Sequence, residues 1–483
     1  MKMTMRSVSR FIISASVAVF LFAGTSLVPG ISDGVAVAQN SKKKDDSKAP
    51  MKGKQSQTLS KRVYELITEA NEKVDAEDYE GAQLVLDKIK AMPKLSAYET
   101  AQMWTFYGFL YFNSEQYDKA TAAYQKVLAQ PELPVGIIQN TYRTLAQLAF
   151  ATEDYGQAIK YAQEYMSLVG EDPEMYVIIG TAYYQMASEK GDAATKADFA
   201  KIIPPVRKAI DLSQQRATER ANETGEPVSG GKGKEQWWLL LRVAYWEQED
   251  YQEVGKILEY MVVNWPKKEY WTQLSGIYSE LNDEKNQLAA YEAAYDQGLL
   301  NKSAEFIQLA QLLIQAEAPY KGARVLEEGF KAGIVERNMR NLRLQSQAWQ
   351  LSQEYRKAIA PLEEAAKLAD DGELYSRLAQ SHLNLSEYKS CITAADKAIK
   401  KGKLKNAGNA YLVLGMCQFE SNQLSNAKTT FRNALKYDKV TKNAKSWIDY
   451  VSSEQSRIEQ LERSLREADE YLRRLDEEQA NRA

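Results

Sequence analysis

A six-residue phrase recurs seven times along the chain, and a recurrence of this kind restricts a chain to a repeat architecture. Six of the seven copies place tyrosine at the third position. Each copy lies between two amphipathic segments with helical spacing, so we expect a repeated unit of helix, turn and second helix. The copies are EDYEGA at 77–82, EQYDKA at 115–120, EDYGQA at 153–158, EDYQEV at 249–254, QEYRKA at 353–358, SEYKSC at 386–391 and NQLSNA at 422–427.

A small residue near the middle of each expected first helix marks the register of the repeat. Small residues at fixed offsets let two helix backbones approach closely while larger side chains fill the space around them. Eight of the nine intervals between markers lie near a period of about 34 residues, and the interval after Gly180 is 62. Arg242 is large, so Trp238, Leu241 and Tyr245 place that copy instead. The markers are Ala70, Gly108, Ala146, Gly180, Arg242, Ser275, Ala310, Ser346, Ala379 and Gly415.

The residues around the second copy follow the pattern W-x2-L-G-x2-Y and then A-x3-F. The matching residues are Trp104, Tyr107, Gly108, Tyr111, Ala120, Tyr124 and Val127. On these residues the chain resembles the tetratricopeptide repeat (TPR) family over about residues 60–440. The resemblance implies an all-α fold, a right-handed superhelical solenoid of about ten antiparallel helix pairs with a long C-terminal helix. HEAT and armadillo repeats have longer periods.

An insertion follows Gly180 and divides the repeats into two predicted lobes. SEKGDAATKAD interrupts the fourth copy, and Pro204 and Pro205 restrict where its second helix begins. Residues 213–235 are polar, Gly-rich and aperiodic, which predicts a flexible loop between an N-terminal lobe at 59–212 and a C-terminal lobe at 236–440. The loop is interpreted as a tolerated surface insertion or as a docking loop.

The first 38 residues have the pattern of a signal peptide. Lys2, Arg6 and Arg10 precede an apolar run of about 13 residues, too short to span a bilayer comfortably. Ala36-Val37-Ala38 is a small-x-small cleavage site, so the mature chain is predicted to begin at Gln39 and to be periplasmic, with an uncleaved anchor helix as the alternative. Residues 39–58 are Lys-rich without apolar periodicity, which predicts a disordered tether. No later segment is predicted to span a membrane.

The last predicted segment, residues 441–483, is a charge-rich helix with an apolar stripe at heptad spacing. One interpretation is a cap on the last repeat, which solenoids need. The other is a coiled coil that joins copies of the chain through residues 451–475. The stripe comprises Ile458, Leu461, Leu465, Ala468, Leu472 and Leu475.

The sequence contains few of the residues that catalysis uses. His382 is the only histidine and occupies a large-aromatic position of the repeat, so a core role is expected. We therefore predict no enzyme activity, no cofactor and no metal site. The alternative is an enzyme with an unrecognised site in 185–235. Cys391 and Cys417 are interpreted as small packing residues, with a disulfide between neighbouring copies as the alternative.

The net charge is −3 for the whole chain, and removing residues 1–38 takes away three positive charges and one negative charge, leaving −5. A mildly acidic exported chain is a poor candidate for binding nucleic acid.

The resemblance implies that the first helices line a concave surface that holds protein partners. Residues at the groove positions are Phe109, Phe112, Phe150, Tyr184 and Trp246, and the alternative is that these rings pack in the core. A secondary basic face is predicted at Arg337, Arg340 and Arg343, with a solvated charge run as the alternative.

The overall layout also resembles TPR proteins encoded beside TonB, ExbB and ExbD. That resemblance implies a scaffold or adaptor that binds cell-envelope proteins and supports TonB-dependent transport across the outer membrane. The alternative is an assembly factor for outer-membrane proteins or polysaccharide export.

Overall fold

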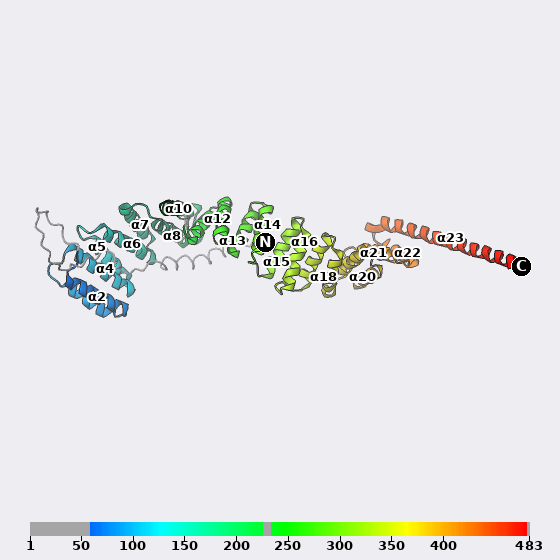
Figure 1. Cartoon of the computed structure of the whole chain (residues 1–483), viewed down its shortest axis with the longest axis horizontal. Coiled ribbons are helices and arrows are strands. Elements are labelled where there is room, and N and C mark those ends of the chain that lie inside the picture. Colours follow the sequence, from blue (N-terminus) through cyan, green and yellow to red (C-terminus); the bar gives the residue numbers. More distant parts are fainter. Residues whose placement is uncertain (1–57, 226–232, 481–483) are drawn as a thin grey trace. The chain divides into compact units, whose positions relative to one another are not determined.

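The computed structural model describes residues 58–225 and 233–480, and every regular element in these ranges is a helix. Figure 1 shows these helices following one another in pairs. The chain divides between Trp265 and Pro266 into two compact units. Each unit contains five helix pairs, and the second unit adds a long terminal helix, so the all-α prediction of about ten pairs is confirmed.

The first unit contains the pairs α2–α3, α4–α5, α6–α7, α8–α10 and α11–α12, with α9 inserted in the fourth. Their bounds are α2 Lys61–Asp75, α3 Tyr79–Lys90, α4 Ala97–Asn113, α5 Tyr117–Leu128, α6 Val135–Ala151, α7 Tyr155–Val169, α8 Pro173–Glu189, α9 Lys196–Ala200, α10 Ile203–Thr224, α11 Glu235–Glu247 and α12 Tyr251–Asn264.

The second unit contains five further pairs and α23. Their bounds are α13 Lys268–Glu280, α14 Glu284–Asp296, α15 Ser303–Gln315, α16 Pro319–Lys331, α17 Met339–Leu351, α18 Tyr355–Leu368, α19 Glu373–Asn384, α20 Tyr388–Lys401, α21 Ala407–Glu420, α22 Leu424–Ala434 and α23 Thr441–Ala480. Short 3-10 turns lie at Gly191–Ala193 and Asp438–Val440.

The recurring phrase forms the turn between the two helices in seven of the ten pairs. In the first copy Glu77 N–H bonds to Val74 O (2.9 Å) and Asp78 N–H bonds to Lys73 O (2.8 Å), the two hydrogen bonds of a Schellman motif. Asp78 then caps the next helix by accepting from Gly81 N–H. Two residues thus end one helix and begin the next. The same left-handed backbone occurs at Glu77, Glu115, Glu153, Glu249, Asn282, Glu317, Gln353, Ser386 and Asn422.

The small marker residues lie at the contact between the two helices of a pair. A methyl group placed on Gly108 would lie 2.7 Å from the Tyr124 ring, and one on Gly415 would lie 2.5 Å from the Phe431 ring. These distances leave no room for a side chain, so the aromatic ring of the second helix occupies the space over the glycine. The predicted close approach is confirmed at these two positions.

We expect Gly415→Ala to lower the midpoint of thermal unfolding, because the added methyl overfills a packed contact at a cost of about 1–3 kcal/mol. Gly276→Ala is the matched control in α13, since its methyl would meet nothing within 4 Å. The control should gain up to about 1 kcal/mol from helix propensity. Equal shifts for the two variants would show that Gly415 does not mark a close contact.

The flexible loop predicted over 213–235 is wrong for its first half, because α10 continues as a helix to Thr224. Its Gln, Arg, Ala and Glu residues are good helix formers, and Gln215 donates to Glu219 one turn later (2.8 Å). The polar composition reflects an exposed helix. The division between the compact units also falls at Trp265 and Pro266, outside the predicted separator. The start of α10 at Ile203, with Pro204 in its first turn, agrees with the restriction inferred from the prolines.

The first part of α23 covers the end of the second unit, as predicted for a cap. Ala444 and Val451 are fully buried, and Trp447 stacks on Phe431 of α22 with ring centroids 5.4 Å apart.

The predicted signal peptide at 1–38, nearly all of the predicted tether at 39–58, and residues 226–232 of the predicted loop lie outside the described residues. Among the described helices, none combines the length and the apolar character that crossing a bilayer requires.

Candidate partner-binding pocket

A pocket of about 320 Å³ lies between α10, α11 and α12 of the first unit. Its apolar wall consists of Ile210, Leu241 and Ile257, which are 6%, 2% and 3% exposed. Trp238 of α11 and Tyr260 of α12 also line it, and both side chains are half-buried. Their rings stack with centroids 4.2 Å apart and 26° between their planes. The pocket therefore offers a stacked aromatic pair beside an aliphatic surface.

Three charged residues on another side of the pocket form one connected network. Arg207 of α10 donates through Nε to the Tyr245 hydroxyl (2.7 Å), and its Nη2 lies 2.6 Å from Glu253. Lys256 Nζ lies 2.6 Å from the other oxygen of Glu253. Burial lowers the pKa of Arg207, but the bonds to Tyr245 and Glu253 raise it by more. The hydrogen bond from Lys256, together with Arg207, holds the pKa of Glu253 below its usual range. These groups therefore stay charged and mutually paired at neutral pH.

Asp211 is the remaining charged residue of the pocket. It is exposed and makes no hydrogen bond or ion pair with the part of the chain that the structure describes. Lys208, one turn earlier on α10, pairs instead with Glu171 (2.9 Å). The Asp211 carboxylate is thus exposed and without a direct ion pair, although its charge helps to raise the pKa of Lys208.

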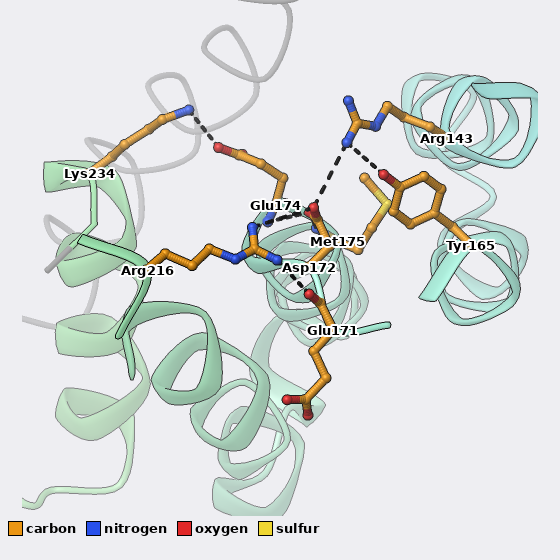
Figure 2. A network of polar contacts seen from close by, with 8 residues as sticks. All are labelled: Arg143, Tyr165, Glu171, Asp172, Glu174, Met175, Arg216 and Lys234. Atoms are coloured by element: carbon orange, nitrogen blue, oxygen red, sulfur yellow. Dashed lines mark hydrogen bonds and ion pairs between the residues drawn. The ribbon is translucent and has the colours of Figure 1, made fainter. Parts of the chain in front are cut away.

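A polar network at the start of α8 connects residues of α6, α7, α8 and α10, as Figure 2 shows. Asp172 caps α8 by accepting from the backbone N–H groups of Glu174 and Met175 (2.9 and 3.2 Å). Arg143 of α6 and Arg216 of α10 each lie 3.9 Å from its second oxygen. Anionic side chains are favourable at a helix N-terminus, so the cap and its two cations reinforce one another.

Two further bonds extend this network to the pocket helices. Arg216 donates to the backbone oxygen of Glu171 (2.6 Å), which fixes α10 against the start of α8. Lys234, the residue before α11, pairs with Glu174 (2.8 Å). The helices that supply Arg207, Asp211 and Trp238 are thus attached to the same helix end.

Two segments match the sequence profile of the tetratricopeptide repeat, residues 101–130 and 408–441. They coincide with the pairs α4–α5 and α21–α22, in which Gly108 and Gly415 mark the helix contacts. Over these two segments the chain is similar to the tetratricopeptide repeat family. Repeats of this family generally act as scaffolds for interactions between proteins. A comparison with curated proteins gives no match.

Solved structures with similar helix pairs are distant in sequence. A tetratricopeptide repeat protein from Parabacteroides merdae is 12% identical to this chain. The match covers 61% of this chain and 100% of that protein, at a TM-score of 0.33. The TPR2AB domain of yeast Sti1, solved in complex with pHSP90, is 14% identical and covers 66% of this chain and 99% of its own, at a TM-score of 0.22. A structure of the APC/C hetero-tetramer Cut9–Hcn1 is 12% identical and covers 80% of this chain and 83% of its own, at 0.27. The family assignment rests on the two matched segments and the helix pairs, not on these similarities.

Three of the five predicted groove aromatics are buried in the TPR core. Phe109, Phe150 and Tyr184 are only 5%, 7% and 4% exposed. Their role in binding a partner stays a prediction, and this burial argues against it because a buried ring offers no surface to a partner.

The other two, Phe112 and Trp246, are half-buried beside the turns of their repeats. Phe112 makes an edge contact with Tyr117 (5.8 Å between centroids), and Trp246 makes the same contact with Tyr251 (5.6 Å). Phe150 repeats the arrangement with Tyr155 at 5.4 Å. Each aromatic precedes the turn, and its tyrosine opens the second helix. The sequence analysis identified the recurring tyrosine but not its partner ring.

The predicted basic face is only partly available. Arg337 Nη2 lies 2.6 Å from Glu364, whose pKa this pairing lowers, and its guanidinium lies 5.1 Å from the centre of the Phe330 ring. Arg340 and Arg343 on α17 are exposed and make no side-chain ion pair within the described residues. A binding role for this face stays a prediction, with two of its three residues exposed and unpaired.

The groups that a catalyst would need serve the fold instead. His382 Nδ1 lies 2.8 Å from Glu387, which also pairs with Arg356 (3.1 Å). In the 185–235 region, a hydrogen bond from Lys190 and two from Thr195 hold the pKa of Asp198 well below its usual range, and Asp198 completes the cap of α9. Within the described ranges no group of three or more His, Cys, Asp or Glu residues could hold a metal ion. TPR folds are typically non-catalytic scaffolds.

The pocket itself was missed from sequence, although two signals pointed to its place. Trp238 served only to set the register of its repeat, and Arg242 was the one large residue at a marker position. Tyr260 and Asp211 come from helices on either side of α11, and no sequence spacing relates them to Trp238.

We expect Phe150→Ala to lower stability by about 3–5 kcal/mol, because it leaves a cavity in the core and removes the edge contact with Tyr155. Chemical denaturation followed by circular dichroism measures the change. Leu84→Ala is the control, since Leu84 of α3 is 66% exposed. If the Phe150→Ala variant keeps its stability but loses partner binding, Phe150 contributes to a partner-binding groove and not to the core.

Proposed function

We propose that this chain is an exported adaptor that holds a segment of a cell-envelope protein in the pocket between α10, α11 and α12. The observation behind the proposal is the stacked pair Trp238 and Tyr260 beside an aliphatic wall, with Asp211 at the same pocket. The occupant that fits is a peptide segment with an aromatic or large aliphatic side chain and a nearby Lys or Arg. The apolar side chain enters against the rings, and the basic residue pairs with Asp211.

The residues that line the pocket favour the binding of a specific peptide segment. Aromatic residues at the centre of an interface often contribute about 2 kcal/mol or more each when truncated. The network formed by Arg207, Lys256 and Glu253 carries one net positive charge. Asp211 brings the net charge of the pocket lining to zero. Because Asp211 is exposed and makes no direct ion pair, a basic residue beside the apolar anchor of the partner can pair with it.

Export is supported by a covalent feature of the second unit. Cys391 of α20 and Cys417 of α21 form a disulfide bond with Cα atoms 6.2 Å apart, which joins neighbouring repeats. Disulfides persist in oxidising compartments such as the bacterial periplasm and are rare in the cytosol. Together with the signal-peptide pattern of residues 1–38, this supports a periplasmic location.

The process served is proposed from the resemblance in layout to TPR proteins encoded beside TonB, ExbB and ExbD. On that basis the partner is a component of TonB-dependent transport across the outer membrane. The alternative is the assembly of outer-membrane proteins or polysaccharide export. The two differ in which envelope protein occupies the pocket.

Affinity capture tests the pocket. The mature chain is used as bait on detergent-solubilised envelope, the enriched protein is identified by mass spectrometry, and its dissociation constant is then measured. Trp238→Ala should weaken binding about 30-fold, the equivalent of about 2 kcal/mol. Asp211→Asn should weaken it less and reduce its dependence on salt.

Tyr450→Ala is the control for these variants, because Tyr450 is 56% exposed in the second unit. Thermal unfolding of each variant checks that the fold is intact. A Trp238→Ala protein that is folded and binds the partner as tightly as the unchanged chain would refute the pocket as the binding site.

Intact-mass measurement of the native protein tests export. The expected mass begins at Gln39 and is lower than that of the reduced chain by about 2 Da, the two hydrogens lost when the disulfide forms. A mass that includes residues 1–38 would contradict cleavage. Free thiols on Cys391 and Cys417 in the native protein would remove the support that the disulfide gives to export.

A further inference from the structure

The terminal helix α23 carries one apolar stripe along its length, and only its first part is covered. The stripe begins with Ala444, Trp447 and Val451, spaced three and four residues apart, and this part packs on α22. The next position of this spacing after Val451 is Glu454, which pairs with Arg457, and apolar residues resume at Ile458 and continue through Leu461 to Leu475. A repeat of 3.5 residues keeps the stripe on one face of a supercoiled helix, so the uncovered part continues the covered one.

The continuing stripe is exposed. Leu461, Leu465 and Leu472 are 51%, 58% and 57% exposed. Figure 1 shows this part of α23 running past α21 and α22, where no other described element lies beside it. Large exposed apolar surfaces on a water-soluble helix mark interaction sites. Most of the stability of helices in proteins comes from packing of an apolar face, and this part of α23 has no such packing within the second unit.

The charged residues beside the stripe determine in which orientation two copies of this helix can pair. With Ile458 at heptad position a and Leu461 at d, the flanking e positions are Glu462, Asp469 and Asp476, and all three are acidic. An antiparallel pairing of two such helices would place the acidic e rows against each other, which is unfavourable. The sequence therefore disfavours an antiparallel pair.

A parallel pairing of two copies brings each g residue beside the following e residue of the other helix. Arg457, which pairs with Glu454 of its own helix (2.7 Å), then lies beside Glu462 of the second copy, so the contact sets opposite charges together. Ser464 meets Asp469, and the Tyr471 hydroxyl meets Asp476, so neither contact sets like charges together. Ile at a with Leu at d in the first heptad also favours two strands. The stripe is thus complementary to itself in one orientation.

We propose that two copies of this chain associate through a parallel, in-register coiled coil formed by residues 458–475. The cap on the last repeat sets where the coil begins, because Val451 is buried against the repeat and Leu461 is the first strongly exposed leucine. Each copy contributes its own array of repeats.

Sedimentation equilibrium of the mature chain over a range of concentrations tests the association. The unchanged chain should reach twice the monomer mass, and Leu465→Glu combined with Leu472→Glu should remain monomeric at every concentration. The matched control combines Ser456→Glu with Gln460→Glu, which adds the same charge on the outer face of the helix and should still form dimers. An unchanged chain that is monomeric throughout would overturn the proposal, as would a dimer that survives both leucine substitutions.

Oxidative crosslinking of a Leu461→Cys variant tests the orientation. In a parallel, in-register dimer the two new thiols face each other and should form a disulfide that links the chains on a non-reducing gel. In an antiparallel dimer they would lie about 15 Å apart along the axis, from the 1.5 Å rise per residue. A dimer by sedimentation that does not crosslink would overturn the parallel arrangement. Association with another envelope protein in place of a second copy would overturn the choice of partner.

Discussion

In nine of the ten helix pairs the marker position of the first helix holds a small residue that lets the two backbones approach closely, and the rest of the architecture depends on that contact. Where the residue is glycine, as at Gly108 and Gly415, an aromatic ring from the second helix covers it at a distance that excludes even a methyl group. The contact sets the spacing within the pair. It also explains why the pairs could be placed from sequence, since a steric requirement at a fixed offset leaves a periodic trace.

The turn was harder to interpret than the helices. The phrase containing Glu77 and Asp78 was recognised as a repeat, but its conformation was not, because the left-handed position holds Glu, Gln, Asn or Ser rather than glycine. The aromatic residue before that turn was assigned to a groove because the resemblance to the family implies a concave surface at those positions. In the structure Phe150 makes an edge contact across the turn with Tyr155, the first residue of the next helix. The sequence shows which residues recur, but a ring beside a turn has the same spacing whether it faces inward or outward.

The candidate pocket lies where the repeat is least regular. α9 is inserted before α10, α10 extends to Thr224, and Arg242 takes the place of a small marker in α11. A long side chain at this position does not permit the close approach found at Gly108. We infer that the helices are held further apart here, which leaves room for the pocket. Regular repeats pack against their neighbours and leave little room, so a departure from the pattern is where a scaffold acquires a specific site. Its position depends on contacts between residues up to 50 positions apart, such as Arg207 and Glu253, which no local pattern encodes.

Dimerisation through the terminal helix would change the affinity with which the pocket binds a partner. A pocket of about 320 Å³ with one aromatic pair and one free carboxylate offers few anchors, and a single peptide held this way binds weakly. If two copies join through α23, each dimer presents two such pockets, and binding at the second becomes intramolecular, with an effective concentration in the millimolar range for short connections. Overall affinity can then rise by a factor of about 100 or more without any new contact. This advantage exists only for a partner that is itself repeated or clustered. If the proposed dimer forms through the exposed leucines from Leu461 to Leu472, a repeated or clustered partner would therefore gain more affinity from it than a monomeric one.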